Sequence, residues 1–154
     1  MSVSVFEQAK IQAQILVPLI KAFQTELGTE RANEIARKAI SDHYRRLGRE
    51  WWSAKRSEDV GSNMASAFAA FSNSDALDIS VREQTDDTYE IDVTRCQYAE
   101  FFQQLGEPEL GFLPVCSPDF PFVEGFDADV KLTRTQTIMQ KASHCDFRYK
   151  RQHD

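Results

Sequence analysis

Several features are scarce in this chain, and each scarcity narrows the class of protein it can be. Its 154 residues include only three cysteines, Cys96, Cys116 and Cys145. An odd number of cysteines cannot all pair within one chain, and in a reducing compartment the three would stay thiols. Their use is then nucleophilic, metal-binding or structural, and the fold has to be held together by its core and not by disulfides.

Long apolar runs and an excess of basic charge are also missing. No stretch approaches the roughly 18 uncharged apolar residues of a membrane span, so no membrane partner is expected. The first seven residues lack the basic start and apolar run of a signal peptide, and we therefore expect a cytoplasmic protein. Lysine and arginine number 18 against 24 acidic residues, a net charge of -6, which argues against nucleic acid as a partner.

The composition that remains is that of a folded domain. Hydrophobic residues make up 42% of the chain and charged residues 27%, which is ordinary for a globular protein. The length suits one domain over 1–154 that is large enough to bury a core. Within it, we expect a helical part at 1–72 and a sheet-containing part at 75–150. The oligomeric state is not predicted.

Apolar residues in the first half recur every three or four positions, which is the period of an amphipathic helix. This pattern predicts helices at 6–27, from an N-cap at Thr29 toward 47–48, and around 64–71. Pro18 interrupts the first helix and is expected to kink it or split it in two. The basic pair Lys55–Arg56 is expected on a solvated face.

The pattern changes after residue 75, where apolar and polar residues alternate. The segments 77–81 and 89–93 predict two strands joined by a turn at 84–87, which is a β-hairpin. Two more strands and two short helices are expected at 130–134, 145–149, 98–105 and 107–111. The predicted fold is therefore α+β, with N-terminal helices packed on a mainly antiparallel sheet of about four strands and short helices inserted.

Chemically active side chains gather near residue 145. His144, Cys145, Asp146 and Arg148 bring an imidazole, a thiol, a carboxylate and a guanidinium into one short segment. If this segment is a regular strand, Cys145 shares one face with Phe147 while His144 and Asp146 occupy the other. A thiol from this segment would then have to work with an acid or base from another one.

Ordered blocks along the second half resemble the L-2-amino-thiazoline-4-carboxylic acid hydrolase family, and the likeness in motif detail covers roughly residues 90 to 149. The blocks are Cys96–Phe102, Leu105–Gly111, Cys116 with Asp119, Glu124–Phe126, Arg134–Thr137 and His144–Tyr149. The family takes its name from an enzyme that opens a thiazoline ring, a cyclic isothiourea, to give N-carbamoyl-L-cysteine. The resemblance implies a hydrolase that acts on a C–N or C–S bond of a small heterocycle.

Such a reaction requires three chemical roles. A base or metal must activate water, or a protein thiolate must attack first; an acid must protonate the leaving sulfur; and a cation should hold the substrate carboxylate. In the nucleophilic version either Cys116 or Cys145 attacks while an acid or base moves protons. The candidate catalytic residues are Cys116, Cys145, His144, Asp119 and Asp146, and the candidate substrate-binding residues are Arg134, Arg148 and Thr135.

Two structural readings stay open beside these roles. Cysteine is often a buried core residue, so each thiol can be explained by packing alone. Arg134 and Arg148 can be ion-pair partners of Asp146 or Asp119 instead of substrate ligands. The aromatic residues on the helices, Trp51, Trp52, Phe68 and Phe71, are expected in the core first, and alternatively as a cover over a pocket on the sheet.

A zinc site is the alternative to thiol chemistry. Three thiolates and an imidazole, from Cys96, Cys116, Cys145 and His144, form a tetrahedral set that zinc accepts. These residues lack the closely spaced pairs of structural zinc sites, so we expect no cofactor.

The competing function is a small-molecule-binding or sensor domain that keeps the scaffold without turnover. Both functions take a small molecule as partner. They differ in whether the candidate groups at 116, 119 and 144–146 meet in one cavity, as catalysis requires.

Overall fold

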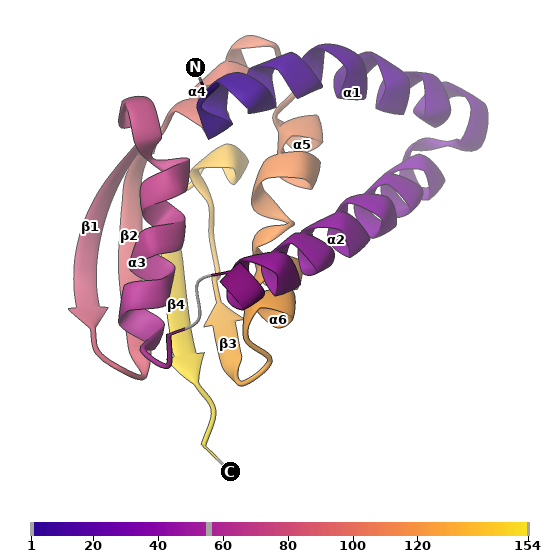
Figure 1. The fold of residues 1–154 in the computed structure, drawn as a ribbon. Coiled ribbons are helices and arrows are strands. Elements are labelled where there is room, and N and C mark those ends of the chain that lie inside the picture. The colour runs from indigo at the N-terminus through magenta and orange to yellow at the C-terminus, as the bar shows by residue number, and fades with distance from the viewer. Residues whose placement is uncertain (1, 55–56, 154) are drawn as a thin grey trace.

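The computed structural model describes residues 2–54 and 57–153. Figure 1 shows the third helix of the chain (residues 60–71) lying in front of a twisted sheet, while the two longer helices before it run across the top and the right of the view. The predicted exposure of Lys55–Arg56 concerns two residues outside those described. Among the described residues, no helix combines the length and the apolarity that crossing a membrane requires.

Two long helices form a hairpin at the start of the chain. Helix α1 spans Val5–Leu27 and begins where the Ser4 hydroxyl accepts a hydrogen bond from the Glu7 backbone N–H at 3.1 Å. It runs through Pro18 as one element, so the predicted split into two helices is wrong. A proline inside a helix removes one backbone hydrogen bond, and in α1 the turns on either side continue without it. Helix α2 follows at Thr29–Ala54; it begins where the sequence predicted and continues beyond the predicted end.

The sheet confirms the α+β class and the antiparallel pairing. Its four strands are β1 (Leu77–Gln84), β2 (Thr88–Cys96), β3 (Val130–Thr133) and β4 (Cys145–Arg151), in the order β1-β2-β4-β3. The predicted hairpin is β1 with β2. The register places Ile91 beside Phe147 and Leu132 beside Tyr149, so apolar side chains of three strands meet on one face.

Only that inner face of the sheet is covered. Helix α3 (Val60–Phe71) packs its buried Met64 and Phe68 against it, and the strands contribute Ile91 and Phe147 to the same core. The outer face is polar and carries ion pairs, which is the usual division in an antiparallel sheet.

Short helical segments connect the β1–β2 hairpin to β3. Helices α4 (Gln97–Gln104) and α5 (Pro108–Gly111) agree with the predicted ones. A π-helical turn (Phe112–Cys116) and α6 (Asp119–Phe126) follow and were not predicted. Prolines at 114, 118 and 121 conceal this helical stretch in the sequence, because proline normally marks a break. The missed segment is the one that positions Cys116 and Asp119.

Helices α2 and α6 touch through their backbones. A Cβ on Gly48 would lie 2.2 Å from the Phe122 carbonyl oxygen, and one on Gly125 would lie 1.9 Å from the Arg45 carbonyl oxygen. No side chain can be accommodated at either point without moving a helix. These two glycines therefore hold α6, and Asp119 at its start, against α2.

We predict that Gly125→Ala lowers the free energy of unfolding by about 3 kcal/mol, because the new methyl group forces the two backbones apart. Urea unfolding followed by circular dichroism measures the change. Ser53→Ala, at an exposed position of α2, is the control and should stay within about 0.5 kcal/mol of the parent. A Gly125→Ala protein as stable as the control would contradict the backbone contact.

Candidate functional site

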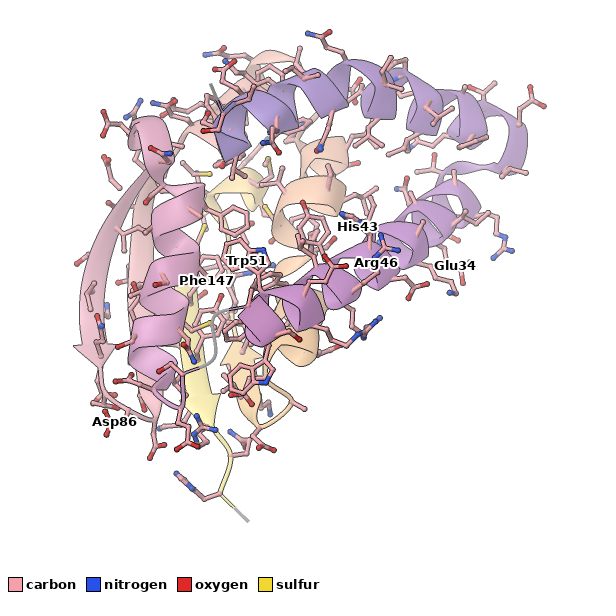
Figure 2. All side chains as sticks on the ribbon, in the orientation of Figure 1. Glu34, His43, Arg46, Trp51, Asp86 and Phe147 are labelled. Atoms are coloured by element: carbon pink, nitrogen blue, oxygen red, sulfur yellow. The ribbon has the colours of Figure 1, made fainter. Side chains whose placement is uncertain are left out.

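A cavity of about 410 Å³ lies between the helices and the inner face of the sheet. Most of its lining is aliphatic or aromatic, with contributions from Leu16 of α1, Trp51 of α2, Phe68 of α3 and Phe147 of β4. Trp51 and Phe147, which are labelled in Figure 2, belong to α2 and β4. The aromatic residues Trp51, Phe68 and Phe71 thus line a pocket, while Trp52 packs edge-on against Phe126, with ring centroids 5.4 Å apart.

A buried ion pair forms part of the cavity wall. Arg134, directly after β3, donates from Nη1 to Asp119 Oδ2 at 2.5 Å and to the Cys116 carbonyl oxygen at 2.9 Å. Its side chain is only 4% exposed. Three aromatic rings surround the guanidinium carbon, with centroids at 5.8 Å for Phe112, 5.0 Å for Phe120 and 5.4 Å for Phe147. Arg134 is therefore held in place by charge, by a carbonyl and by cation–π contacts.

Asp119 is the acidic partner and the more exposed of the two, with 27% of its side chain accessible. It lines the cavity, so this accessible part can meet a ligand. Burial raises the pKa of Asp119 to about 7, and the attraction of Arg134 opposes that rise without cancelling it. Both protonation states are therefore populated at neutral pH, which is the property required of a group that both accepts and returns a proton.

The hydroxyl groups of two tyrosines, Tyr44 and Tyr149, are affected by the charge of the Asp119 carboxylate. Burial, and after it the charge of Asp119, raises the pKa of Tyr44, and the same two causes raise the pKa of Tyr149 well above its ordinary value. Both tyrosines line the cavity. They remain protonated near neutral pH and can donate hydrogen bonds.

The three thiols also reach the cavity, but in their protonated form. Burial raises the pKa of Cys96 to about 11, that of Cys116 well above its ordinary value and that of Cys145 above it. Cys145 Sγ accepts a hydrogen bond from the Ile138 backbone N–H at 3.2 Å, and Cys96 Sγ accepts one from the Ala99 N–H at 3.4 Å. A neutral thiol is a weak nucleophile, so attack by Cys116 or Cys145 first requires a base.

His144 and Asp146 are turned away from the cavity, as the alternation along the strand predicts. The Asp146 carboxylate accepts hydrogen bonds from the backbone N–H groups of Thr135 at 2.8 Å and Gln136 at 3.0 Å, and from the Thr135 hydroxyl. Burial alone would raise the pKa of Asp146, but these hydrogen bonds lower it below its ordinary value. The His144 ring nitrogen lies 2.8 Å from the Ser143 hydroxyl. Asp146 and Thr135 thus fasten the loop after β3 to β4.

Arg148 belongs to the outer face of the sheet and does not line the cavity. It donates from Nη2 to Asp92 at 2.8 Å and from Nη1 to the Ile91 carbonyl at 2.7 Å. Its carboxylate partners are therefore Asp92 and, at 3.7 Å, Glu90. Neither Asp119 nor Asp146, the two acids that the sequence offered, is among them. For Arg134 the ion-pair reading with Asp119 is confirmed.

Among residues 2–54 and 57–153, no group of three or more histidine, cysteine, aspartate or glutamate side chains is arranged to hold a metal ion. The zinc alternative required Cys96, Cys116, Cys145 and His144 together. The three cysteines line the cavity, whereas His144 is not one of its lining residues.

Three tyrosines line the cavity, Tyr44, Tyr98 and Tyr149, and sequence reasoning assigned none of them to the site. Tyr149 follows Cys145 and Phe147 at every second position, so strand alternation alone assigns it to the same face. Tyr44 precedes Leu47 and Trp51 by three and seven positions, and all three line the cavity from one side of α2. Both signals were present in the sequence.

Comparison with solved structures supports this arrangement of elements. One match is the crystal structure of the phenol-responsive sensory domain of the transcription activator PoxR with phenol, with a TM-score of 0.52 and 12% sequence identity. The match covers 98% of this chain and 76% of that one. At this identity the likeness concerns the fold alone.

Comparison of the sequence itself gives two results. No curated protein matches it. The family model described as L-2-amino-thiazoline-4-carboxylic acid hydrolase matches residues 8–149, which is nearly the whole chain and takes in both the helical and the sheet-containing part. The ordered blocks around Cys116, Asp119, Arg134 and Cys145 and this full-length match lead to the same conclusion: the chain belongs to the L-2-amino-thiazoline-4-carboxylic acid hydrolase family.

Proposed function

We propose that this protein is a hydrolase that opens a small cyclic amidine-like ring, with Asp119 as its general base and acid. The observation that carries the proposal is the Asp119–Arg134 ion pair in the wall of the cavity. Membership of the family supports a hydrolase-like function. L-2-amino-thiazoline-4-carboxylate is the first compound to test.

The proposed reaction starts with addition of water. The Asp119 carboxylate takes a proton from a water molecule, whose oxygen bonds to the ring carbon between nitrogen and sulfur. The electron pair of the C=N bond moves to the ring nitrogen, which receives the proton from Asp119. The result is a tetrahedral carbon that carries a hydroxyl group.

Ring opening completes the reaction. The hydroxyl gives its proton to Asp119 while its C=O bond forms, and the C–S bond breaks with its electron pair on sulfur. Asp119 then protonates the sulfur, so one water is consumed and an N-carbamoyl amino acid with a free thiol is released. Arg134 keeps Asp119 oriented, and its charge prevents the carboxyl pKa from rising even further above neutrality.

Thiol attack is the second version of the chemistry. Cys116 or Cys145 would bond to the ring carbon after losing its proton to Asp119, and water would then release the product. The raised thiol pKa values make this route depend on the same carboxylate. His144, Asp146, Arg148 and Thr135 have no role in either version, because they lie outside the cavity lining.

A ligand-binding domain without turnover is the second candidate function. The predominantly apolar lining favours it, since an apolar chamber retains an aromatic molecule without any chemistry. The partial scatter of the candidate groups favours it too, because Cys116, Asp119 and Cys145 line the cavity whereas His144 and Asp146 do not. The PoxR domain of similar fold is described as phenol-responsive, which makes a simple aromatic compound the matching probe. Saturable binding of such a compound with no turnover of any thiazoline would favour this function.

We predict that Asp119→Asn lowers kcat/KM for the thiazoline at least 100-fold, which is the lower end of the range for a lost general base. Release of the product thiol is measured with a thiol reagent. Asp129→Asn removes an exposed carboxylate and serves as the matched control with unchanged activity. Retained activity in a folded Asp119→Asn protein would exclude Asp119 as the base.

The raised pKa of Asp119 also predicts how stability depends on pH, and this test requires no substrate. The folded protein holds a proton on Asp119 up to a pKa of about 7, whereas an unfolded aspartate loses it near its ordinary pKa of 3.8. The resulting stabilisation is complete below that lower value and is lost as the pH rises toward about 7. Between pH 5 and pH 8 the parent should therefore lose free energy of unfolding relative to Asp119→Asn. Parallel pH profiles of the two proteins would contradict the raised pKa.

Separate cysteine-to-serine variants distinguish the two chemical versions. If water attacks directly, Cys116→Ser and Cys145→Ser keep kcat within about tenfold of the parent, because neither sulfur forms a bond to substrate. Cys96→Ser is the control at the third thiol of the cavity. Loss of turnover in one of the first two variants alone, with rapid formation of a covalent adduct in the parent, would establish thiol attack.

A further inference from the structure

The cavity is much larger than the thiazoline ring that the proposed chemistry requires. An apolar cavity of roughly 150 Å³ already accommodates benzene, and this one measures about 410 Å³. A bare five-membered ring placed at Asp119 would leave most of the space to water or to nothing.

The walls of the remaining space are apolar. Away from the ion pair, they include Leu16 and Val17 of α1, Met64 and Ala67 of α3, and Val93 of β2. Water is poorly held against such walls, because an ordered water needs two to four polar partners. The space therefore matches a hydrocarbon portion of a ligand.

The charged groups in the cavity indicate which polar head group a ligand would carry. Among the described lining residues, the groups with acidic, basic or imidazole side chains are Asp119, Arg134 and His43. Asp119 and Arg134 neutralise each other, and His43 is exposed at the surface of α2. Nη1 of Arg134 already donates to Asp119 and to the Cys116 carbonyl, so a substrate carboxylate would have to share a guanidinium whose charge is already paired. An amidine N–H, in contrast, has the accessible Asp119 carboxylate as acceptor.

The mouth of the cavity is marked by the lining residues that remain exposed. These are Gln8 and Gln12 of α1 and His43 of α2. A ligand enters between these two helices, with α3 and the sheet forming the far walls.

From the volume, the apolar walls and the paired charges we propose that the substrate is a hydrophobic cyclic amidine: a 2-amino-thiazoline-like head without a carboxylate, bearing an alkyl or aryl body. This inference rests on the proposed hydrolase function for the identity of the head. The alkyl or aryl body is inferred from the volume and the apolar walls of the cavity, independently of the chemistry at Asp119.

Isothermal titration calorimetry on the full chain tests the proposal. The probes are 2-amino-2-thiazoline, its 4-alkyl homologues up to hexyl, and L-2-amino-thiazoline-4-carboxylate. Affinity should rise roughly fourfold for each added methylene until the chain fills the space, which is the gain from burying a methylene. The hexyl compound should bind at least 100-fold more tightly than the carboxylate. Affinity that does not change with chain length, or tightest binding of the carboxylate, would overturn the proposal.

A matched pair of variants on α3 locates the alkyl body. Ala67 is buried and lines the cavity, whereas Ala69 is exposed and does not. Ala67→Leu should weaken binding of the hexyl compound at least tenfold and leave that of 2-amino-2-thiazoline unchanged, while Ala69→Leu should alter neither. If Ala67→Leu fails to fold, Ala13→Leu on α1 fills the cavity from the opposite side. Equal binding by the filled and control variants would contradict this location of the body.

Turnover of the same compounds separates the two proposals. Binding that strengthens with chain length without any hydrolysis would overturn the hydrolase function and leave the ligand class standing. Hydrolysis of L-2-amino-thiazoline-4-carboxylate, with no gain in affinity from alkyl groups, would overturn the ligand class and leave the hydrolase function standing. Absence of binding by every compound would overturn both.

Discussion

The contact between Arg134 and Asp119 is the interaction on which the site depends. It joins the end of β3 to the start of α6, and the Cys116 carbonyl adds the π-helical turn to the same guanidinium. Removing two charges from water costs several kcal/mol for each ion, and a buried pair recovers this only with good geometry and further hydrogen bonds. The carbonyl and the three surrounding rings supply those additional contacts. A buried ion pair is therefore weak evidence for stability on its own.

The rest of the molecule keeps that pair out of bulk water while leaving it accessible to a ligand. Helices α1, α2 and α3 cover the inner face of the sheet without filling the space above it. The same burial that keeps the carboxyl pKa near neutrality keeps the thiols protonated. One physical cause, desolvation, thus makes Asp119 a better proton carrier and the cysteines poorer nucleophiles.

The sequence allowed most of the fold to be predicted, because periodicity is a local property. The helical and alternating patterns identified the long helices and all four strands, and alternation correctly separated Cys145 from His144 and Asp146. Helix α6 was missed because Pro118 and Pro121 lie at its start, and proline in a sequence normally indicates a break in a helix. The partners of the arginines depend on long-range geometry: Arg148 meets Asp92 only because β4 lies beside β2 in a particular register. Local patterns carry no information about such a register.

The cavity walls come from elements that are far apart in the chain. Leu16 belongs to the first helix and Phe147 to the last strand, and both face the same space. The first helix is synthesised early and the last strand late. The chamber can therefore close only after the last strand has been made. A molecule that fills the chamber would contact both, so its binding free energy would be added to the stability of their association. Such a ligand would act, in effect, as a removable part of the hydrophobic core.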